Sequence, residues 1–328
     1  MPGRRRTNRT TPRLAVLAVG GGLAAAVSLA AGLWAALPDP APLARENPRT
    51  TALIEQRRAE ARASRRPFRP RQAWVPADRI APALVHAVIL SEDANFFGHE
   101  GFDWEALRDA AEHDLKVRRF ARGASTLTQQ LAKNLWLGTE RSLWRKAKEA
   151  VLAAKLERTL TKRRILALYL NVVEMDDGVF GVEAGARHRF GTSAAALTPA
   201  QAAVLASLLP APRRVDLDHP SSWLKGRARR LLDRMREVGR LDAAAHRTAS
   251  AELERILSGS APGDDREEPP DDDDARAPAA SAPAARPVAA SAADVDAASL
   301  ASDDQNGGAG TAGQSAVVPK EHGGAPQE

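Results

Sequence analysis

A long apolar stretch lies close to the start of the chain. Residues 14–37 hold 24 positions without a charged side chain. As a helix with a rise of about 1.5 Å per residue, the stretch would span about 36 Å, which is enough to cross a hydrocarbon core of about 30 Å. Five arginines precede it, and basic flanks stay cytoplasmic. The pattern predicts a retained transmembrane anchor with the body outside the cytoplasmic membrane. The alternative, a cleaved signal peptide, would have a shorter apolar region of about 7–15 residues.

Beyond the anchor, apolar side chains recur at helical spacing from residue 80 to residue 257. Pro82 fits the first turn of one helix. Capping residues predict five further helix starts, at Thr126, Ser142, Thr161, Thr198 and Ser221. No alternation of apolar and polar residues is long enough to predict a strand. The predicted class is therefore mainly α.

The chain divides by composition into five parts. Residues 1–13 form a cytoplasmic basic tail, 14–37 the anchor, 38–79 a juxtamembrane connector and 80–257 the folded domain. The connector contains a predicted short helix near Thr51–Ala63. Its arginine-rich part, residues 57–71, either lies along anionic headgroups or is simply solvated. Residues 258–328 are acidic and rich in Ala and Pro, and are predicted to be a disordered tail.

Charge is distributed unevenly along the chain. The formal net charge is +6, yet residues 264–328 carry 14 acidic and 4 basic side chains. The rest is strongly basic, which suits nucleic acid, anionic lipid or a phosphorylated substrate as partner. Export of the body argues against nucleic acid. The chain has no cysteine, which excludes disulfides and thiolate metal sites.

A first polar cluster, residues 91–101, follows the helix that begins near Pro82. It contains Glu92, Asp93 and His99. A carboxylate at the end of an apolar helix is partly removed from water. Burial and a neighbouring like charge both favour the protonated form of a carboxyl group, which suits a general base. The alternative is a pair of solvated carboxylates at a helix end.

A second cluster, residues 123–134, combines hydroxyls and amides with one lysine. Ser125 and Thr126 stand at a helix N-terminus that follows a glycine, a place where phosphate groups bind. Gln130 and Lys133 share one face of that helix. An ordinary capped amphipathic helix would explain the leucines at 127, 131 and 135, but not this run of polar groups.

A third cluster places one carboxylate near two cations. Glu149 comes four residues after Arg145 and three after Lys146, so both can pair with it on one helix. Leu152 and Leu156 lie on the same side. The carboxylate is therefore expected to be buried and to need its cationic partners. A surface ion pair is the alternative.

A fourth cluster, residues 162–183, is predicted to be mainly structural. Tyr169 and Leu170 are expected in the core, and Asn171 is expected to end a helix. The glycines at 178 and 181 indicate a loop with unusual backbone angles.

In this order and spacing, the four clusters resemble glycosyltransferase family 51, the transglycosylases of class A penicillin-binding proteins and of monofunctional enzymes. The likeness covers about residues 76–220. It implies a lysozyme-like two-lobed helical domain with a cleft near the membrane. It also implies polymerisation of lipid II into β-1,4-linked glycan strands. In this reaction undecaprenyl diphosphate is the leaving group, and the configuration at the anomeric carbon is inverted. Because no transpeptidase domain fits after residue 258, the monofunctional type is expected.

The resemblance also implies roles for single residues. Glu92 would be the general base that deprotonates the acceptor hydroxyl, and Glu149 would orient cations or substrate. The diphosphate would be held by Lys133, Arg145 and Lys146. The remaining predicted substrate-binding residues are Asp93, His99, Ser125, Thr126 and Gln130.

Four positions depart from the family pattern. Ala167 stands where Glu is common, Met175 and Asp176 where an aromatic residue and Gly are common, and Gly185 where Ala is usual. These departures bear on the loop after Asn171.

The implied partners are lipid II, the growing glycan strand, membrane lipids and other cell-wall synthesis proteins. No cofactor and no dedicated metal site are predicted, and a divalent cation at the diphosphate is left open.

Two rival functions are kept. One is a lysozyme-like glycan-cleaving enzyme, either a hydrolase or a lytic transglycosylase, which would need a carboxylic acid to protonate its leaving group. The other is a non-catalytic cell-wall scaffold.

Overall fold

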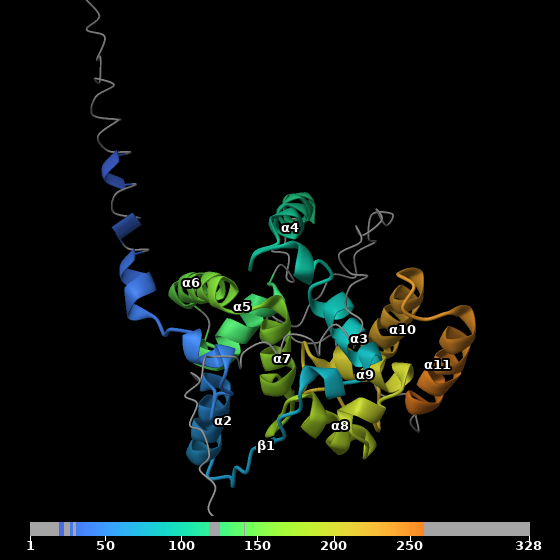
Figure 1. Ribbon diagram of the computed structural model, residues 1–328. Coiled ribbons are helices and arrows are strands. Elements are labelled where there is room, and N and C mark those ends of the chain that lie inside the picture. The colour runs from blue at the N-terminus through green and yellow to red at the C-terminus, as the bar shows by residue number, and fades with distance from the viewer. Residues whose placement is uncertain (1–19, 23–26, 29–30, 118–124, 141, 259–328) are drawn as a thin grey trace, which may run out of the picture.

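The computed structural model describes residues 20–22, 27–28, 31–117, 125–140 and 142–258. Its principal helices are α2 (Ala52–Ala63), α3 (Pro82–Glu92), α4 (Trp104–Val117), α5 (Leu127–Ala132), α6 (Leu143–Thr159), α7 (Lys162–Val172), α8 (Val182–Phe190), α9 (Pro199–Leu208), α10 (Ser222–Glu237) and α11 (Ala243–Ile256). Short turns of helix are η1 (Ala41–Ala44), η2 (Ala77–Arg79), η3 (Phe96–Gly98), the π-helix η4 (Lys133–Leu137) and η5 (Ala194–Ala196). The predicted mainly α class is confirmed. Figure 1 shows α4 at the upper edge of the helical body.

Side-chain caps open five of these helices at the predicted positions. In each case the hydroxyl oxygen accepts a hydrogen bond from the backbone N–H three residues further on. The caps are Thr126, Ser142, Thr161, Thr198 and Ser221. Pro82 also lies in the first turn of α3, as predicted. Asn171 does not end α7, because the helix continues to Val172.

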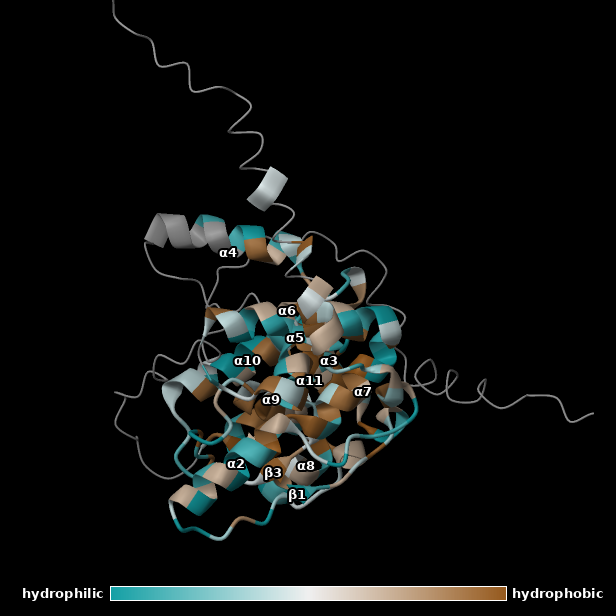
Figure 2. Cartoon of the chain, turned by 90° about the vertical axis from the view of Figure 1, so that its left-hand side faces the viewer, coloured by the Kyte–Doolittle hydropathy of each residue, from teal (hydrophilic) through white to brown (hydrophobic). Residues whose placement is uncertain are grey.

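The core is centred on α9. Ala200 and residues 202–208 of this helix are buried, and α3, α8, α10 and α11 pack around it. A helix that is apolar on all sides is stable only when it is covered on all sides. Figure 2 shows the hydrophobic residues gathered in the middle of the body and hydrophilic ones on outer helices such as α2.

A small sheet, which the sequence did not predict, lies beside the helices. Its order is β1 (Arg71–Gln72), β3 (Val179–Phe180) and β2 (Glu174–Asp176), with β1 parallel and β2 antiparallel to β3. Arg71 pairs with Val179, and Gln72 pairs with Phe180. Strands of two or three residues are too short to show an alternating pattern, which explains why they were missed.

The segment predicted as a connector, residues 38–79, packs against the body. It supplies β1 and also α2, which starts after Thr51 as predicted. Leu53 and Ile54 of α2 are buried against Phe180, and Arg57 forms an ion pair of 2.7 Å with Glu174. At least one arginine of the basic segment 57–71 is therefore directed to the protein and not to solvent or headgroups.

Much of the predicted membrane anchor lies outside the described residues, namely 14–19, 23–26 and 29–30, as do residues 1–13 and 259–328. Within the part of the chain that is described, no helix is long and apolar enough to cross a membrane. The end of the stretch contacts α6. Lys155 Nζ donates to the carbonyl oxygens of Trp34 (3.0 Å) and Leu37 (2.8 Å).

Candidate active site

Glu92 is the last residue of α3, and its side chain is only 10% exposed. Its Oε1 accepts a hydrogen bond from Ser91 Oγ at 2.8 Å and one from Arg227 Nη2 at 3.0 Å. Its Oε2 accepts one from Gln130 Nε2 at 3.2 Å. The amide of Gln130 is held in turn, because its Oε1 accepts from the buried Tyr169 hydroxyl at 3.0 Å. The predicted base is therefore largely buried and fixed on both oxygens.

Asp93 points to a different set of partners. One carboxylate oxygen is 2.9 Å from His99 Nε2, and the other accepts from the backbone N–H of Leu127 at 2.9 Å. A carboxylate at a helix N-terminus satisfies a backbone donor that lacks an intrahelical partner. Asp93 and His99 therefore tie the loop after α3 to the start of α5 and do not contact Glu92 directly.

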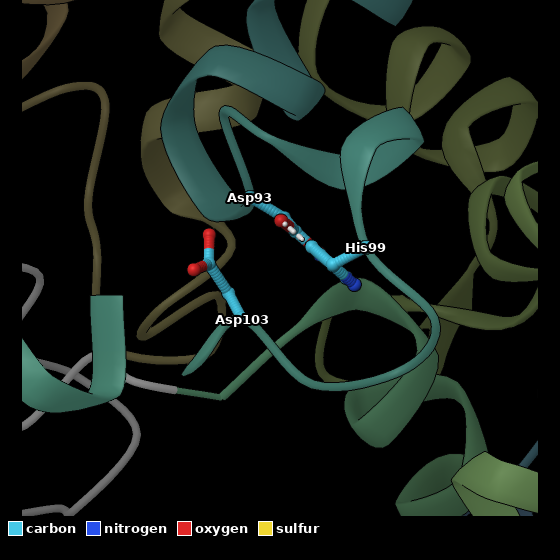
Figure 3. Close-up of side chains that lie close together, drawn as sticks. All are labelled: Asp93, His99 and Asp103. Carbon is cyan, nitrogen blue, oxygen red and sulfur yellow. Dashed lines mark hydrogen bonds and ion pairs between the residues drawn. The ribbon is translucent and has the colours of Figure 1, made fainter. Parts of the chain in front are cut away.

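A third carboxylate lies near this pair. Ligand atoms of Asp93, His99 and Asp103 all fall within 4.8 Å of one another, close enough to hold a metal ion. Figure 3 shows the Asp103 carboxylate beside Asp93 and the second ring nitrogen of His99 turned away from both. Asp103 Oδ1 also accepts from the backbone N–H of Ala106 at 2.9 Å. Each carboxylate thus also has a backbone donor.

The start of α5 gathers the predicted hydroxyl and amide residues. Thr126 makes a capping box with Gln129 and donates to the Gly101 carbonyl at 2.8 Å. Ser125 Oγ accepts from Lys146 Nζ at 2.9 Å. Lys133 lies where α5 passes into the π-helix η4, and its side chain is half-buried. π-Helical turns of this kind occur often at functional sites.

The cation cluster on α6 is arranged as predicted. Glu149 is 2% exposed, forms an ion pair of 2.5 Å with Arg145 and pairs with Lys146 as well. Two cations around one carboxylate leave a net positive charge. Nε of Arg145 is buried without a hydrogen-bond partner. The group therefore has positive charge and unused donor capacity for an anion.

One short segment, residues 125–130, connects the two halves of the site. Ser125 contacts Lys146 at one end, and Gln130 contacts Glu92 at the other. Ser125 and Thr126 precede α5, and residues 127–130 form its first turn. The predicted base and the predicted diphosphate-binding cations are therefore linked through this segment, although among the described residues Glu92 makes no direct bond to Arg145 or Lys146.

A hollow of about 660 Å³ lies next to this region. Its lining is residues 97–100 together with Ala154, Glu157, Arg158, Leu160 and Lys162. Neither Glu92 nor Glu149 lines it, so this hollow is not the space between the two predicted catalytic carboxylates.

The fourth cluster forms a structural junction. Asn171 accepts from the Val75 N–H at 2.9 Å and donates to the carbonyls of Val75 (3.0 Å) and Ala167 (2.8 Å). Gly181 has φ +80, and a Cβ there would lie 2.6 Å from the Asn171 carbonyl oxygen. Only glycine fits that position. The predicted structural role is confirmed.

The sequence did not indicate Arg227 or the polar role of Tyr169. Arg227 lies in a helix with four other arginines, and nothing in the pattern separates it from them. Trp223, whose ring centroid is 5.8 Å from the Arg227 guanidinium carbon, was the one available signal, as an isolated aromatic residue beside a basic run.

Comparisons with known proteins cover the same region. A family model described as Transglycosylase matches residues 59–236. The biosynthetic peptidoglycan transglycosylase of Nitrosospira multiformis is 43% identical over 189 residues, which are 58% of this chain and 82% of that protein. Proteins of the same name from Methylobacillus flagellatus and Bordetella pertussis are 50% identical over 163 residues and 46% over 196. These matches cover 50% and 58% of this chain, and 71% and 81% of the relatives.

Proposed function

The chain belongs to the transglycosylase family, and from this premise we infer that it is a peptidoglycan glycosyltransferase of cell-wall biosynthesis. Its substrates are then the lipid-linked disaccharide and the growing glycan strand. The observation that carries the inference is the segment 125–130, which contacts the buried Glu92 at one end and Lys146 of the Arg145–Lys146 pair at the other. We also propose the two-lobed, lysozyme-like architecture, with which the mainly helical body and its small sheet are consistent.

The residue types suit transfer from a lipid diphosphate. Such a leaving group is already anionic, so it needs positive charge and not a proton donor. One base is then sufficient. In the proposed step, the acceptor hydroxyl oxygen bonds to the anomeric carbon of the donor as the bond to the diphosphate breaks. Glu92 takes the hydroxyl proton, and the diphosphate leaves with the electron pair. A single displacement converts the α-linked donor into a β-1,4 product.

The cations have separate parts in this scheme. Arg145 and Lys146 hold the diphosphate and stabilise its developing charge, with Lys133 contributing from the end of α5. Glu149 orients Arg145 and Lys146, because its buried carboxylate contacts both. The hydroxyl of Ser125 fixes the Lys146 ammonium from the other side.

The cleavage rival is not favoured. The named relatives are biosynthetic enzymes, and glycan cleavage would give no use to the cations around Glu149. The test incubates the purified full chain with lipid-linked disaccharide in one tube and with finished peptidoglycan in another. We expect polymer in the first tube and unchanged strands in the second. Shortened strands without polymer would refute the assignment.

Catalysis is separated from a scaffold role by one variant. Glu92→Gln keeps the size of the side chain but cannot accept the proton, so we expect polymer formation to fall at least about 100-fold. Equal amounts of polymer from the variant and the wild type would remove Glu92 as the base.

We also propose that residues 14–37 anchor the chain in the cytoplasmic membrane with the catalytic domain outside. The 24 uncharged positions and the five preceding arginines support this. A reporter enzyme that is active only outside the cytoplasm, fused after residue 258, should be active and remain in the membrane fraction. Activity in the soluble fraction would indicate a cleaved signal peptide, and a silent reporter would refute export of the domain.

A further inference from the structure

A buried arginine from α10 contacts the proposed base. Arg227 and Glu92 are 135 residues apart in the chain, but α10 packs against α3 and brings them together. The two side chains are 12% and 10% exposed. The same Nη2 also donates to Ser91 Oγ at 2.8 Å. The contact is therefore a largely desolvated ion pair and not a surface pair.

Burial removes the Arg227 guanidinium from water, which is unfavourable for a charged group. Burial lowers the pKa of the Arg227 guanidinium, and the Glu92 carboxylate opposes that change. Its Nε is buried without a hydrogen-bond partner. A buried cation with an unsatisfied donor is unfavourable unless a nearby anion compensates for it. Glu92 is that anion, so the two charges depend on each other.

Besides Glu92, the groups that act electrostatically on the Arg227 guanidinium are Arg230 on α10 and Tyr169 on α7. The other titratable groups on the elements nearby are His86 on α3 itself, Asp93 and His99 after α3, and Lys133 at the end of α5. Helix α9, which also packs on α3, carries no titratable side chain. From outside α3, Arg227 donates a charged hydrogen bond to Glu92, while Tyr169 acts through the neutral amide of Gln130.

The two oxygens of Glu92 are used unequally. Among the described residues, Oε1 accepts two hydrogen bonds, from Ser91 and Arg227, and Oε2 accepts one, from Gln130. A carboxylate oxygen has two acceptor sites. These residues therefore fill both sites of Oε1 and one site of Oε2, which makes Oε2 the oxygen to receive a further proton.

We propose that Arg227 is a positioning residue for glycosyl transfer, which holds Oε1 of Glu92 so that Oε2 receives the proton of the acceptor hydroxyl. The proposal rests on Glu92 being the base. Without this contact the Glu92 carboxylate can rotate, so its Oε2 should face the acceptor hydroxyl less often and the chemical step should slow.

The test measures kcat and KM for polymerisation of lipid-linked disaccharide by the full chain. In Arg227→Met, kcat should fall by about tenfold while KM changes little, because a misplaced base slows the chemical step more than it weakens substrate binding. Arg227→Lys, which keeps a charged donor, should restore most of kcat. If Arg227→Met does not fold, Arg227→Gln, which keeps uncharged donors, should have a kcat between those of the wild type and an enzyme without the contact.

The matched control is Arg229→Met on the same helix. Arg229 is 49% exposed and pairs with Glu254, so its loss should leave kcat and KM unchanged. A wild-type kcat in Arg227→Met, or a loss of kcat that Arg227→Lys does not restore, would reduce Arg227 to a structural role and overturn the proposal. That outcome differs from failure of the base itself, which would appear as an active Glu92→Gln variant.

Discussion

Adjacent residues can have opposite tasks, and the two carboxylates after α3 illustrate this. Glu92 is held by Arg227 and Gln130, whereas Asp93 is engaged by His99 and the N-terminus of α5. The end of a helix turns successive side chains in different directions. Chemistry is therefore assigned to Glu92, and the connection between α3 and α5 to Asp93.

Two departures from the family pattern explain each other. A Cβ added to Gly185 would lie 2.8 Å from Cγ and 2.9 Å from Cβ of Met175. Met175 is 1% exposed, and these atoms lie close to its backbone, so they cannot easily move away. The glycine at 185 provides the space that the methionine at 175 occupies.

We therefore expect Gly185→Ala to lower the free energy of unfolding by about 1–3 kcal/mol through overpacking. Met175→Ala makes room for the added methyl group. Denaturant unfolding of both single variants and of the double variant should show that the double variant loses less stability than the two single losses added together.

The matched control for this pair is Gly226→Ala on α10. The nearest contact there is the flexible end of Arg230, at 3.0 Å from the added Cβ. Since alanine is the better helix former, Gly226→Ala should be neutral or stabilising by up to about 1 kcal/mol. Strict additivity of the Met175 and Gly185 changes would contradict the packing argument.

At the residue scale, the sequence predicted contacts that are close in the chain. Glu149 was assigned to Arg145 and Lys146 because helical spacing places residues three and four apart side by side. Arg227 was not assigned to Glu92, because no local rule relates residues 135 positions apart. That contact depends on how α10 packs on α3, which only the folded chain shows.

At the scale of elements, α5 is short but tied at several points. The capping box of Thr126 and the Asp93 carboxylate fix its start, and η4 continues it beyond Ala132. The cap was visible in the sequence because its residues are three apart. The π-helical turn was not, since its sequence also fits an ordinary α-helix.

Helix α6 has a second element-scale function at its C-terminal half. Lys155 is 8% exposed, donates to two carbonyl oxygens of residues 34 and 37, and lies 5.5 Å from the Trp34 ring centroid. Residues 31–36 are helical, and carbonyl oxygens near the end of a helix lack intrahelical donors. Lys155 supplies donors to two carbonyl oxygens at this end. The contact fixes the path by which the chain enters the body.

Lys155→Met keeps most of the side-chain volume but removes these donors. Charged hydrogen bonds contribute about 1.5–3 kcal/mol each, so without them residues 34–37 and the chain that follows should detach from α6 more often. We expect limited tryptic cleavage after Arg45 and Arg49 to become about tenfold faster, measured by mass spectrometry of the first fragments. Lys148→Met on the same helix serves as the control. An unchanged cleavage rate in Lys155→Met would show that the contact does not restrain the segment.

For the whole molecule, the main difference from the sequence prediction concerns residues 38–79. Their high proline and arginine content was interpreted as a connector. In the fold, α2 covers Phe180, and β1 forms one edge of the sheet that follows the Asn171 junction. Composition could not show this, because the partners lie far along the chain: Arg57 of α2 binds Glu174, 117 residues later, and Arg71 of β1 pairs with Val179.

A truncation series tests how far the folded unit extends. A chain beginning at residue 80 lacks α2 and β1, which exposes Phe180 and leaves the Glu174 carboxylate without Arg57. Glu174 and Arg57 side chains are 6% and 13% exposed, and removal of one partner of such a buried pair costs about 3–5 kcal/mol. We therefore expect this chain to be insoluble or to unfold at a much lower temperature than a chain beginning at residue 39. The single variant Arg57→Met in the longer chain should reproduce part of the loss. Equal melting temperatures for the two truncated chains would show instead that residues 39–79 are dispensable and that the boundary at residue 80 holds.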